Sequence, residues 1–92
     1  MFQHKHNNSK GVFFVSEEEE IVAELTYSMQ QEHQMMIDHT EVNEELRGGN
    51  IGYELVLKAV DYARTHHYTI IPACEFASAV LEKKPKFKDV LA

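Results

Sequence analysis

The feature that most constrains the fold of this chain is a glycine-rich segment at residues 41–52, Glu-Val-Asn-Glu-Glu-Leu-Arg-Gly-Gly-Asn-Ile-Gly. The segment joins an apolar run at residues 35–42 to a helical pattern that begins near Ile51. Its glycines and asparagine allow positive φ, and glycine has no Cβ to hold a ligand away from the backbone. The following helix adds free N–H groups and the positive end of its dipole. We therefore predict that the segment binds an anion, phosphate or pyrophosphate, with Arg47 supplying positive charge.

Neither nucleotide-binding fingerprint fits this segment. A P-loop requires Gly-x-x-x-x-Gly-Lys-Ser/Thr, and the chain contains no Gly-Lys-Ser or Gly-Lys-Thr. A dinucleotide loop requires Gly-x-Gly-x-x-Gly within a longer strand-helix-strand unit, and that pattern does not fit either. A strand-to-helix turn whose glycines serve folding alone is the alternative interpretation.

The first half of the chain has the alternation of β-strands. Residues 2–6 and 11–16 flank a cluster of turn formers, which predicts a hairpin, and the glutamates at 17–20 belong on a solvated connection. His4 and His6 are expected on one strand face as solvent-exposed residues, and the alternative, a metal site, would need further ligands that the sequence does not identify. In the next strand one face is predicted to carry Ile21, Ala23, Leu25, Tyr27 and Met29. In the strand at 35–42 one face is predicted to carry Ile37, His39 and Glu41, and the other Asp38, Thr40 and Val42. Polar groups on both faces are unusual within a sheet and suggest a site.

The second half combines two helices with one strand. Residues 51–66 have the apolar spacing of an amphipathic helix. Residues 68–73 form a β-rich run that we expect to pair in parallel with residues 35–42, and Pro72 should end that pairing. A second helix is predicted at residues 75–83, with an apolar stripe of Phe76, Ala79, Val80 and Lys83. The predicted fold class is therefore α/β (α+β): a mostly antiparallel sheet with one parallel strand pair and two main helices.

Length and charge narrow the functional classes. The 92 residues suggest one domain, residues 1–92, as a monomer or weak homodimer. A net charge of −6 argues against nucleic acid or an anionic membrane as a partner, whereas an amine is compatible with it. Cys74 is the only cysteine, and the N-terminus has no apolar signal region, so we expect a cytoplasmic protein.

With these elements in place, the loop that begins at Arg47 and ends at Gly52 resembles the Arg/Gln-x-x-Gly-x-Gly/Ala loop of the GNAT superfamily of acyl-CoA-dependent N-acetyltransferases. The family's middle glycine falls on Asn50, and Gly49 occupies its usual polar position. Three stretches look like those of a group of very small GNAT-like proteins, namely residues 37–40, 47–52 and 71–76. The resemblance implies a minimal GNAT fold whose parallel strands splay around acetyl-CoA.

The resemblance also assigns roles to individual residues. It implies that backbone groups near Val42 contact the pantetheine and thioester of acetyl-CoA. It places the pyrophosphate on the amides of Arg47, Gly48, Gly49, Asn50, Ile51 and Gly52. Lys83, Lys84, Lys86 and Lys88 form a solvated face, or one of them meets the 3′-phosphate of coenzyme A.

The candidate catalytic residues are Cys74 and His39. GNAT enzymes commonly carry a tyrosine acid on the final helix, and Leu81 stands at that position here. Cys74 then serves as proton donor or transient acyl acceptor, or coenzyme A leaves as a thiolate unaided. His39 is the nearest candidate base, with Glu41 behind it. The structural alternatives are a small buried cysteine and a strand histidine bonded to Asp38 or Thr40.

The function that the resemblance implies is transfer of an acetyl group from acetyl-CoA to a primary amine, on a small molecule or a protein. A non-catalytic acyl-CoA-binding or regulatory module is the alternative, and a small interaction protein without a cofactor is a third possibility. Only residues 7–10 separate the first two strands, so the acceptor side should be open.

Overall fold

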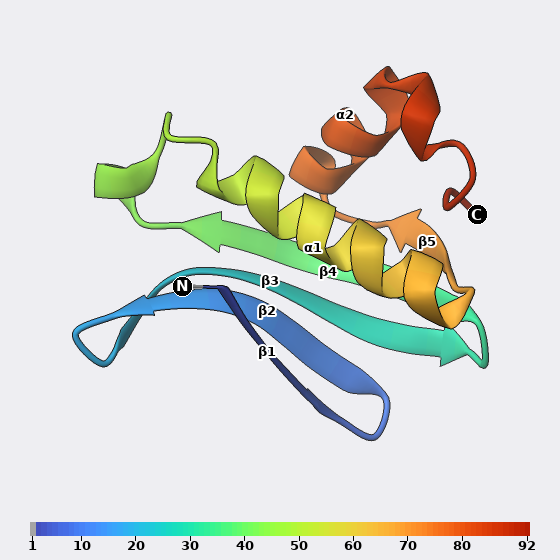
Figure 1. Ribbon diagram of the computed structural model, residues 1–92, viewed down its shortest axis with the longest axis horizontal. Coiled ribbons are helices and arrows are strands. Elements are labelled where there is room, and N and C mark those ends of the chain that lie inside the picture. The colour runs from blue at the N-terminus through green and yellow to red at the C-terminus, as the bar shows by residue number, and fades with distance from the viewer. Residues whose placement is uncertain (1) are drawn as a thin grey trace.

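The computed structural model describes residues 2–92, whose strands form one five-stranded sheet in the order β1-β2-β3-β4-β5 (Figure 1). The strands are β1 Phe2–Asn7, β2 Lys10–Glu17, β3 Glu20–Gln31, β4 Gln34–Val42 and β5 Thr69–Pro72. The helices are α1 Ile51–His66 and α2 Glu75–Lys83, with 3₁₀ turns η1 Glu44–Leu46 and η2 Pro85–Phe87. The first four strands are antiparallel, and β5 is parallel to β4. The predicted fold class is confirmed.

The connections between the first three strands are short and exposed, as predicted. Asn8 has a φ of 52°, and Glu18 and Glu19 have φ of 51° and 70°. Such left-handed turns match the right-handed twist of the strands that they join. Within residues 2–92 no helix is long and apolar enough to cross a membrane.

Ile21 was expected on the buried face of β3, and that expectation is wrong, because its side chain is 53% exposed. The register shifts beside it: Val15 pairs with Ala23 and Ser16 with Ile21, which leaves Val22 as an extra residue. A β-bulge of this kind reverses the alternation of side chains beyond it. Val22 is therefore buried, and Ile21 lies on the opposite face.

A second bulge lies in the middle of β4. Thr26 pairs with His39 and Tyr27 with Ile37, so Asp38 is the extra residue. Because the alternation reverses there, the prediction that Ile37 and His39 share a face is wrong. Ile37 is fully buried, whereas His39 is exposed.

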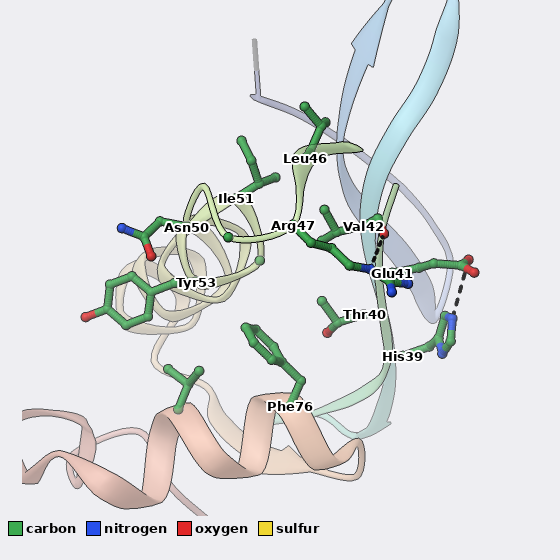
Figure 2. Close-up of a pocket in the computed structure, with 13 residues that line it drawn as sticks. His39, Thr40, Glu41, Val42, Leu46, Arg47, Asn50, Ile51, Tyr53 and Phe76 are labelled. Carbon is green, nitrogen blue, oxygen red and sulfur yellow. Dashed lines mark hydrogen bonds and ion pairs between the residues drawn. The ribbon is translucent and has the colours of Figure 1, made fainter. Parts of the chain in front are cut away.

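Beyond this bulge the two faces of β4 differ in character. Thr40 pairs with Leu25 and Val42 with Ala23, and these two partners are buried in the core. Thr40 and Val42 therefore lie on the core side of the sheet. Glu41 lies on the other side with His39, as Figure 2 shows.

The core lies between the sheet and the helices. The predicted apolar face of α1 is buried, consisting of Leu55, Val56, Ala59, Val60 and Ala63. On α2 the predicted stripe is wrong: Ala77 and Leu81 are buried, while Phe76 is 43% exposed. Apolar residues occupy most of this short helix, so its sequence is compatible with two stripes, and packing against α1 and β5 selects the one that begins at Ala77.

The parallel pairing of β4 and β5 ends at Ile37 and Pro72, as predicted from the proline. One further hydrogen bond joins the N–H of Ala73 to the carbonyl of Ile37, at 3.0 Å. β4 continues to Val42 without β5 beside it, so the two chain segments separate. The C-terminal tail packs on the other edge of β5, where Leu91 forms a parallel bridge with Ile70.

His4 was expected to be solvent-exposed, and the structure instead places it in an aromatic cluster. Its Nε2 lies 2.6 Å from the hydroxyl oxygen of Tyr27, and its ring stacks on Phe13 with centroids 4.1 Å apart. His6 is exposed. Burial lowers the pKa of His4, and the charges of His6 and His66 lower it further.

This lowered pKa predicts a loss of stability in mild acid. The folded protein binds a proton at His4 less readily than the unfolded chain, which protonates it near its ordinary pKa of about 6.5. The unfolded state therefore binds more protons as the pH falls below that value, and the free energy of unfolding decreases. We expect urea denaturation at pH 7.5 and 5.5 to show a smaller loss for His4→Gln than for the wild type. An equal loss in both proteins would contradict this assignment, and His6→Gln is the matched exposed control.

Candidate functional site

A groove of about 650 Å³ opens where β4 separates from β5. In Figure 2 the end of β4 forms one wall, the start of α1 the other, and α2 lies beneath them. The seven residues predicted to bind the cofactor lie on or beside this groove. Six line it, namely Val42, Arg47, Gly48, Asn50, Ile51 and Gly52, and Gly49 does not.

The backbone of the glycine-rich loop is left-handed at two positions. Gly48 has a φ of 90° and Asn50, the residue that precedes α1, has a φ of 67°. Within residues 2–92 the Asn50 side chain makes no capping hydrogen bond to the helix. The first bond of the helix runs from the N–H of Glu54 to the carbonyl of Asn50, so the N–H groups before Glu54 have no acceptor within the helix. Amides of this kind are suited to binding an anion, and that they bind one here stays a prediction.

Gly52 lies where α1, α2 and β4 come together. A Cβ at this position would lie 2.9 Å from Cζ of Phe76 and 3.6 Å from a methyl carbon of Val42. The φ of Gly52 lies outside the left-handed region, so a glycine is not required here by the backbone conformation. It is required because α1, α2 and β4 approach one another closely at this position. Its backbone forms part of the groove surface.

Arg47 reaches across the groove to β4. Its Nε donates a hydrogen bond to the carbonyl of Val42 at 3.2 Å, marked by a dashed line in Figure 2. That carbonyl lies beyond Ile37 and Pro72, the last residues at which β4 and β5 pair. The side chain thus places a positive charge beside the loop and occupies a main-chain acceptor.

Cys74 lies at the opening between the separated strands, directly before α2. Its Sγ accepts a hydrogen bond from the N–H of Ala77 at 3.4 Å, so the thiol caps the helix. The same sulfur lies 3.4 Å from Oγ1 of Thr40, which lines the groove. Sequence reasoning missed this contact, because it follows from the bulge at Asp38.

His39 lies on the other side of β4. Its Nε2 is 3.6 Å from a carboxylate oxygen of Glu41, and both side chains are largely exposed, at 58% and 66%. The expected partners of His39 were Asp38 or Thr40, and the structure shows Glu41 instead. Figure 2 shows both side chains directed away from Thr40. The structure therefore does not bring His39 and Cys74 into contact, and they lie on opposite faces of β4.

A further groove residue, Tyr53, was not identified from the sequence. Its hydroxyl oxygen accepts a hydrogen bond from Nζ of Lys84 at 3.2 Å, and this nitrogen lies 4.7 Å from the centroid of its ring. The hydrogen bond lowers the pKa of Tyr53, and the charges of Lys84 and Lys86 act in the same direction. The sequence feature that could have identified Tyr53 is its position in the first helical turn after the glycine-rich loop.

Comparisons with known proteins agree with this architecture. Residues 12–90 match the sequence profile of a family described as GCN5-related N-acetyl-transferase. The solution structure of a GCN5-like protein from Staphylococcus aureus is 34% identical, with a TM-score of 0.76 over 98% of this chain and 87% of that one. A search of curated proteins gave no significant match.

More distant solved structures share the fold. The aminoglycoside acetyltransferase meta-AAC0020 from an uncultured soil metagenomic sample is 19% identical, with a TM-score of 0.64 over 90% of this chain and 59% of that one. A GNAT family acetyltransferase from Elizabethkingia anophelis, solved with acetyl-CoA bound, is 17% identical, with a TM-score of 0.59 over 68% of this chain and 42% of that one. The present chain thus spans about half the length of these two proteins.

Proposed function

The chain belongs to the GCN5-related N-acetyltransferase family, and on that premise we propose that it transfers the acetyl group of acetyl-CoA to a primary amine. The single observation that carries the proposal for this chain is the groove, which gathers six of the seven residues predicted to bind acetyl-CoA. The amine is on a small molecule or a protein.

We place the pyrophosphate of acetyl-CoA on the amides between Arg47 and Gly52, of which those of Arg47 and Gly49 already donate to the carbonyls of Glu44 and Leu46. Left-handed backbone at Gly48 and Asn50 supports this placement, because it exposes N–H groups at the start of α1. Arg47 adds charge and can bond the phosphate oxygens with its planar guanidinium. The pantetheine then runs along the free edge of β4. The carbonyl of Val42 accepts one hydrogen bond from Arg47, and its second lone pair can accept another from an amide of the pantetheine.

The opening between β4 and β5 has two faces that suit two substrates. On the core side, Thr40 and Cys74 lie where we place the thioester. On the other side, His39 and Glu41 lie where an amine can approach. Glu24 lies directly opposite Glu41 across the strands, a like-charge pair that costs stability and suits a cationic amine.

These positions give each residue a role in acyl transfer. His39 takes a proton from the amine, whose nitrogen attacks the thioester carbonyl. A main-chain N–H near Val42 stabilises the resulting oxyanion, and one such donor contributes on the order of 10²–10³ in rate. When the carbon–sulfur bond breaks, Cys74 protonates the departing coenzyme A thiolate. The amide product retains the acetyl group.

Leu81 favours a second candidate function. It occupies the position where the resemblance places a tyrosine acid, and it is fully buried in the core. A chain without that acid is compatible with an acyl-CoA-binding or regulatory module that has no turnover.

Acetyl-CoA titration followed by amide NMR tests the proposal directly, because the chain has four glycines. We expect Gly48, Gly49 and Gly52 to shift on binding, whereas Gly11 in β2 serves as the internal control. No shift at saturating acetyl-CoA would overturn the cofactor assignment and favour an interaction protein.

Transfer is measured separately, with labelled acetyl-CoA and a panel of amines and peptides. We expect labelled product with at least one primary amine. Binding without transfer to any acceptor would favour the non-catalytic module.

A further inference from the structure

Thr40 lies between the groove and Cys74. It lines the groove, and Figure 2 shows its side chain on the groove side of β4, with His39 directed to the other side. Its Oγ1 also lies 3.4 Å from Sγ of Cys74. Cys74 itself lines a separate hollow, together with Glu75 and Ser78. The thiol therefore meets the groove through the Thr40 hydroxyl.

The hydrogen-bonding capacity of the two side chains indicates the direction of this contact. Sγ of Cys74 already accepts a hydrogen bond from the N–H of Ala77, and within residues 2–92 Thr40 is the acceptor that its S–H can reach. A threonine hydroxyl has one donor and two acceptor lone pairs. When it accepts from the Cys74 thiol, its own proton has no acceptor in the described part of the chain. That proton is available to a ligand in the groove.

We infer that Thr40 is the catalytic residue that protonates the departing coenzyme A thiolate, and that Cys74 resupplies Thr40 with the proton. The inference rests on the proposed function, because it concerns the acid step of the same acyl transfer. It refines the role of Cys74, whose thiol then acts through Thr40. An aliphatic hydroxyl is a poor acid by itself, whereas a thiol is a stronger one. Thr40 thus supplies the contact with the leaving group, and Cys74 supplies the acid.

Protons and electron pairs balance over this proton relay. As the tetrahedral intermediate collapses, the carbon–sulfur bond breaks and its electron pair stays on the sulfur of coenzyme A. The Thr40 hydroxyl gives its proton to that sulfur and takes one from the Cys74 thiol. The Cys74 thiolate that remains keeps its hydrogen bond from the N–H of Ala77. It regains a proton from solvent, and His39 releases to solvent the proton that it took from the amine.

Turnover and acetyl-CoA affinity of Thr40 variants test the relay, with acetyl-CoA and the amine that reacts fastest in the labelled-acetyl panel. Thr40→Val keeps the branched shape without the hydroxyl, so kcat should fall on the order of 100-fold. The affinity for acetyl-CoA by isothermal titration should not change, because the relay acts only in the transition state. Thr40→Ser restores a hydroxyl and should recover most of the loss. Thr69→Val is the matched control and should keep wild-type turnover, since the Thr69 hydroxyl bonds the carbonyl of His33 outside the groove.

Combined variants show whether the two residues act on one proton path. Thr40→Val together with Cys74→Ser should lower kcat about 100-fold, no further than either change alone. Two independent roles would instead multiply the losses to about 10,000-fold, which would overturn the relay. Thr40→Cys places a thiol directly in the groove, so it should recover turnover in the Cys74→Ser background.

The outcomes separate this inference from the proposed function. Wild-type kcat in Thr40→Val, or no recovery in Thr40→Ser, would overturn the relay, while transfer by the wild type would still support the proposed function. No recovery on placing the thiol at position 40 would also overturn it, since Cys74 would then reach the sulfur without Thr40. Absence of transfer to any amine by the wild type would overturn the proposed function and the relay with it.

Discussion

Replacement of Gly52 by valine is expected to weaken acetyl-CoA binding by up to roughly 100-fold while the protein remains folded. A Cβ at Gly52 points toward Phe76 and Val42, so the valine side chain projects into the space between α1, α2 and β4. We place the pantetheine and pyrophosphate along this surface. Overpacking of a close contact costs about 1–3 kcal/mol, and the larger value corresponds to a loss in affinity of roughly 100-fold.

The fold should tolerate the change for two reasons. The ring of Phe76 is 43% exposed and can rotate away from the new side chain. In addition, glycine is a poor helix former, so valine in the first turn of α1 offsets part of the strain. We therefore expect thermal unfolding to shift by only a few degrees.

Titration of acetyl-CoA into a graded series of variants checks this prediction. Gly52→Ala should bind more weakly than the wild type, and Gly52→Val should bind more weakly again, by up to roughly 100-fold relative to the wild type. Gly49→Ala is the matched comparison, because a Cβ there meets only the carbonyl oxygen of Leu46, at 3.4 Å, and lies outside the groove. Its loss of affinity should be far smaller. Wild-type affinity in Gly52→Val would mean that the cofactor lies elsewhere.

The fold could be predicted from the sequence where its pattern is periodic. The helix period of α1 and the position of Pro72 gave the extent of that helix and the end of the parallel pairing. The bulges at Val22 and Asp38 could not be predicted, because a strand with a bulge contains the same kinds of residue as a strand without one. The bulge at Val22 places Ile21 on the face opposite to the predicted one, and the bulge at Asp38 does the same for His39.

In the candidate site, too, the local features could be predicted from the sequence, and the contacts between distant residues could not. The glycine-rich loop is local in sequence, so left-handed backbone could be anticipated from its glycines and Asn50, although within the loop only Gly48 and Asn50 adopt it. The contacts of Thr40 with Cys74 and of Tyr53 with Lys84 join residues 34 and 31 positions apart. Such pairs depend on how helices and strands pack, which residue type and spacing do not determine. The single-domain organisation, the oligomeric state and the compartment stay predictions.

Cys74 offers the sharpest test of the chemistry, because its thiol caps α2 and also lies at the opening. Serine is a strong capping residue, so Cys74→Ser should preserve the start of α2 and the melting temperature. If the thiol protonates the departing thiolate, kcat should nevertheless fall on the order of 100-fold, the lower end for general acid catalysis. Wild-type turnover in Cys74→Ser would leave the cysteine a structural cap, with the thiolate departing unaided.

His39 should produce a different signature, since it acts on the amine from the other face of β4. His39→Gln is expected to lower kcat/KM on the order of 100-fold. Glu41→Gln, which removes the carboxylate 3.6 Å from His39, should lower kcat/KM by a smaller factor. Melting temperatures should change little, because both side chains are exposed. An unaltered kcat/KM in His39→Gln would show that His39 does not take the proton from the amine.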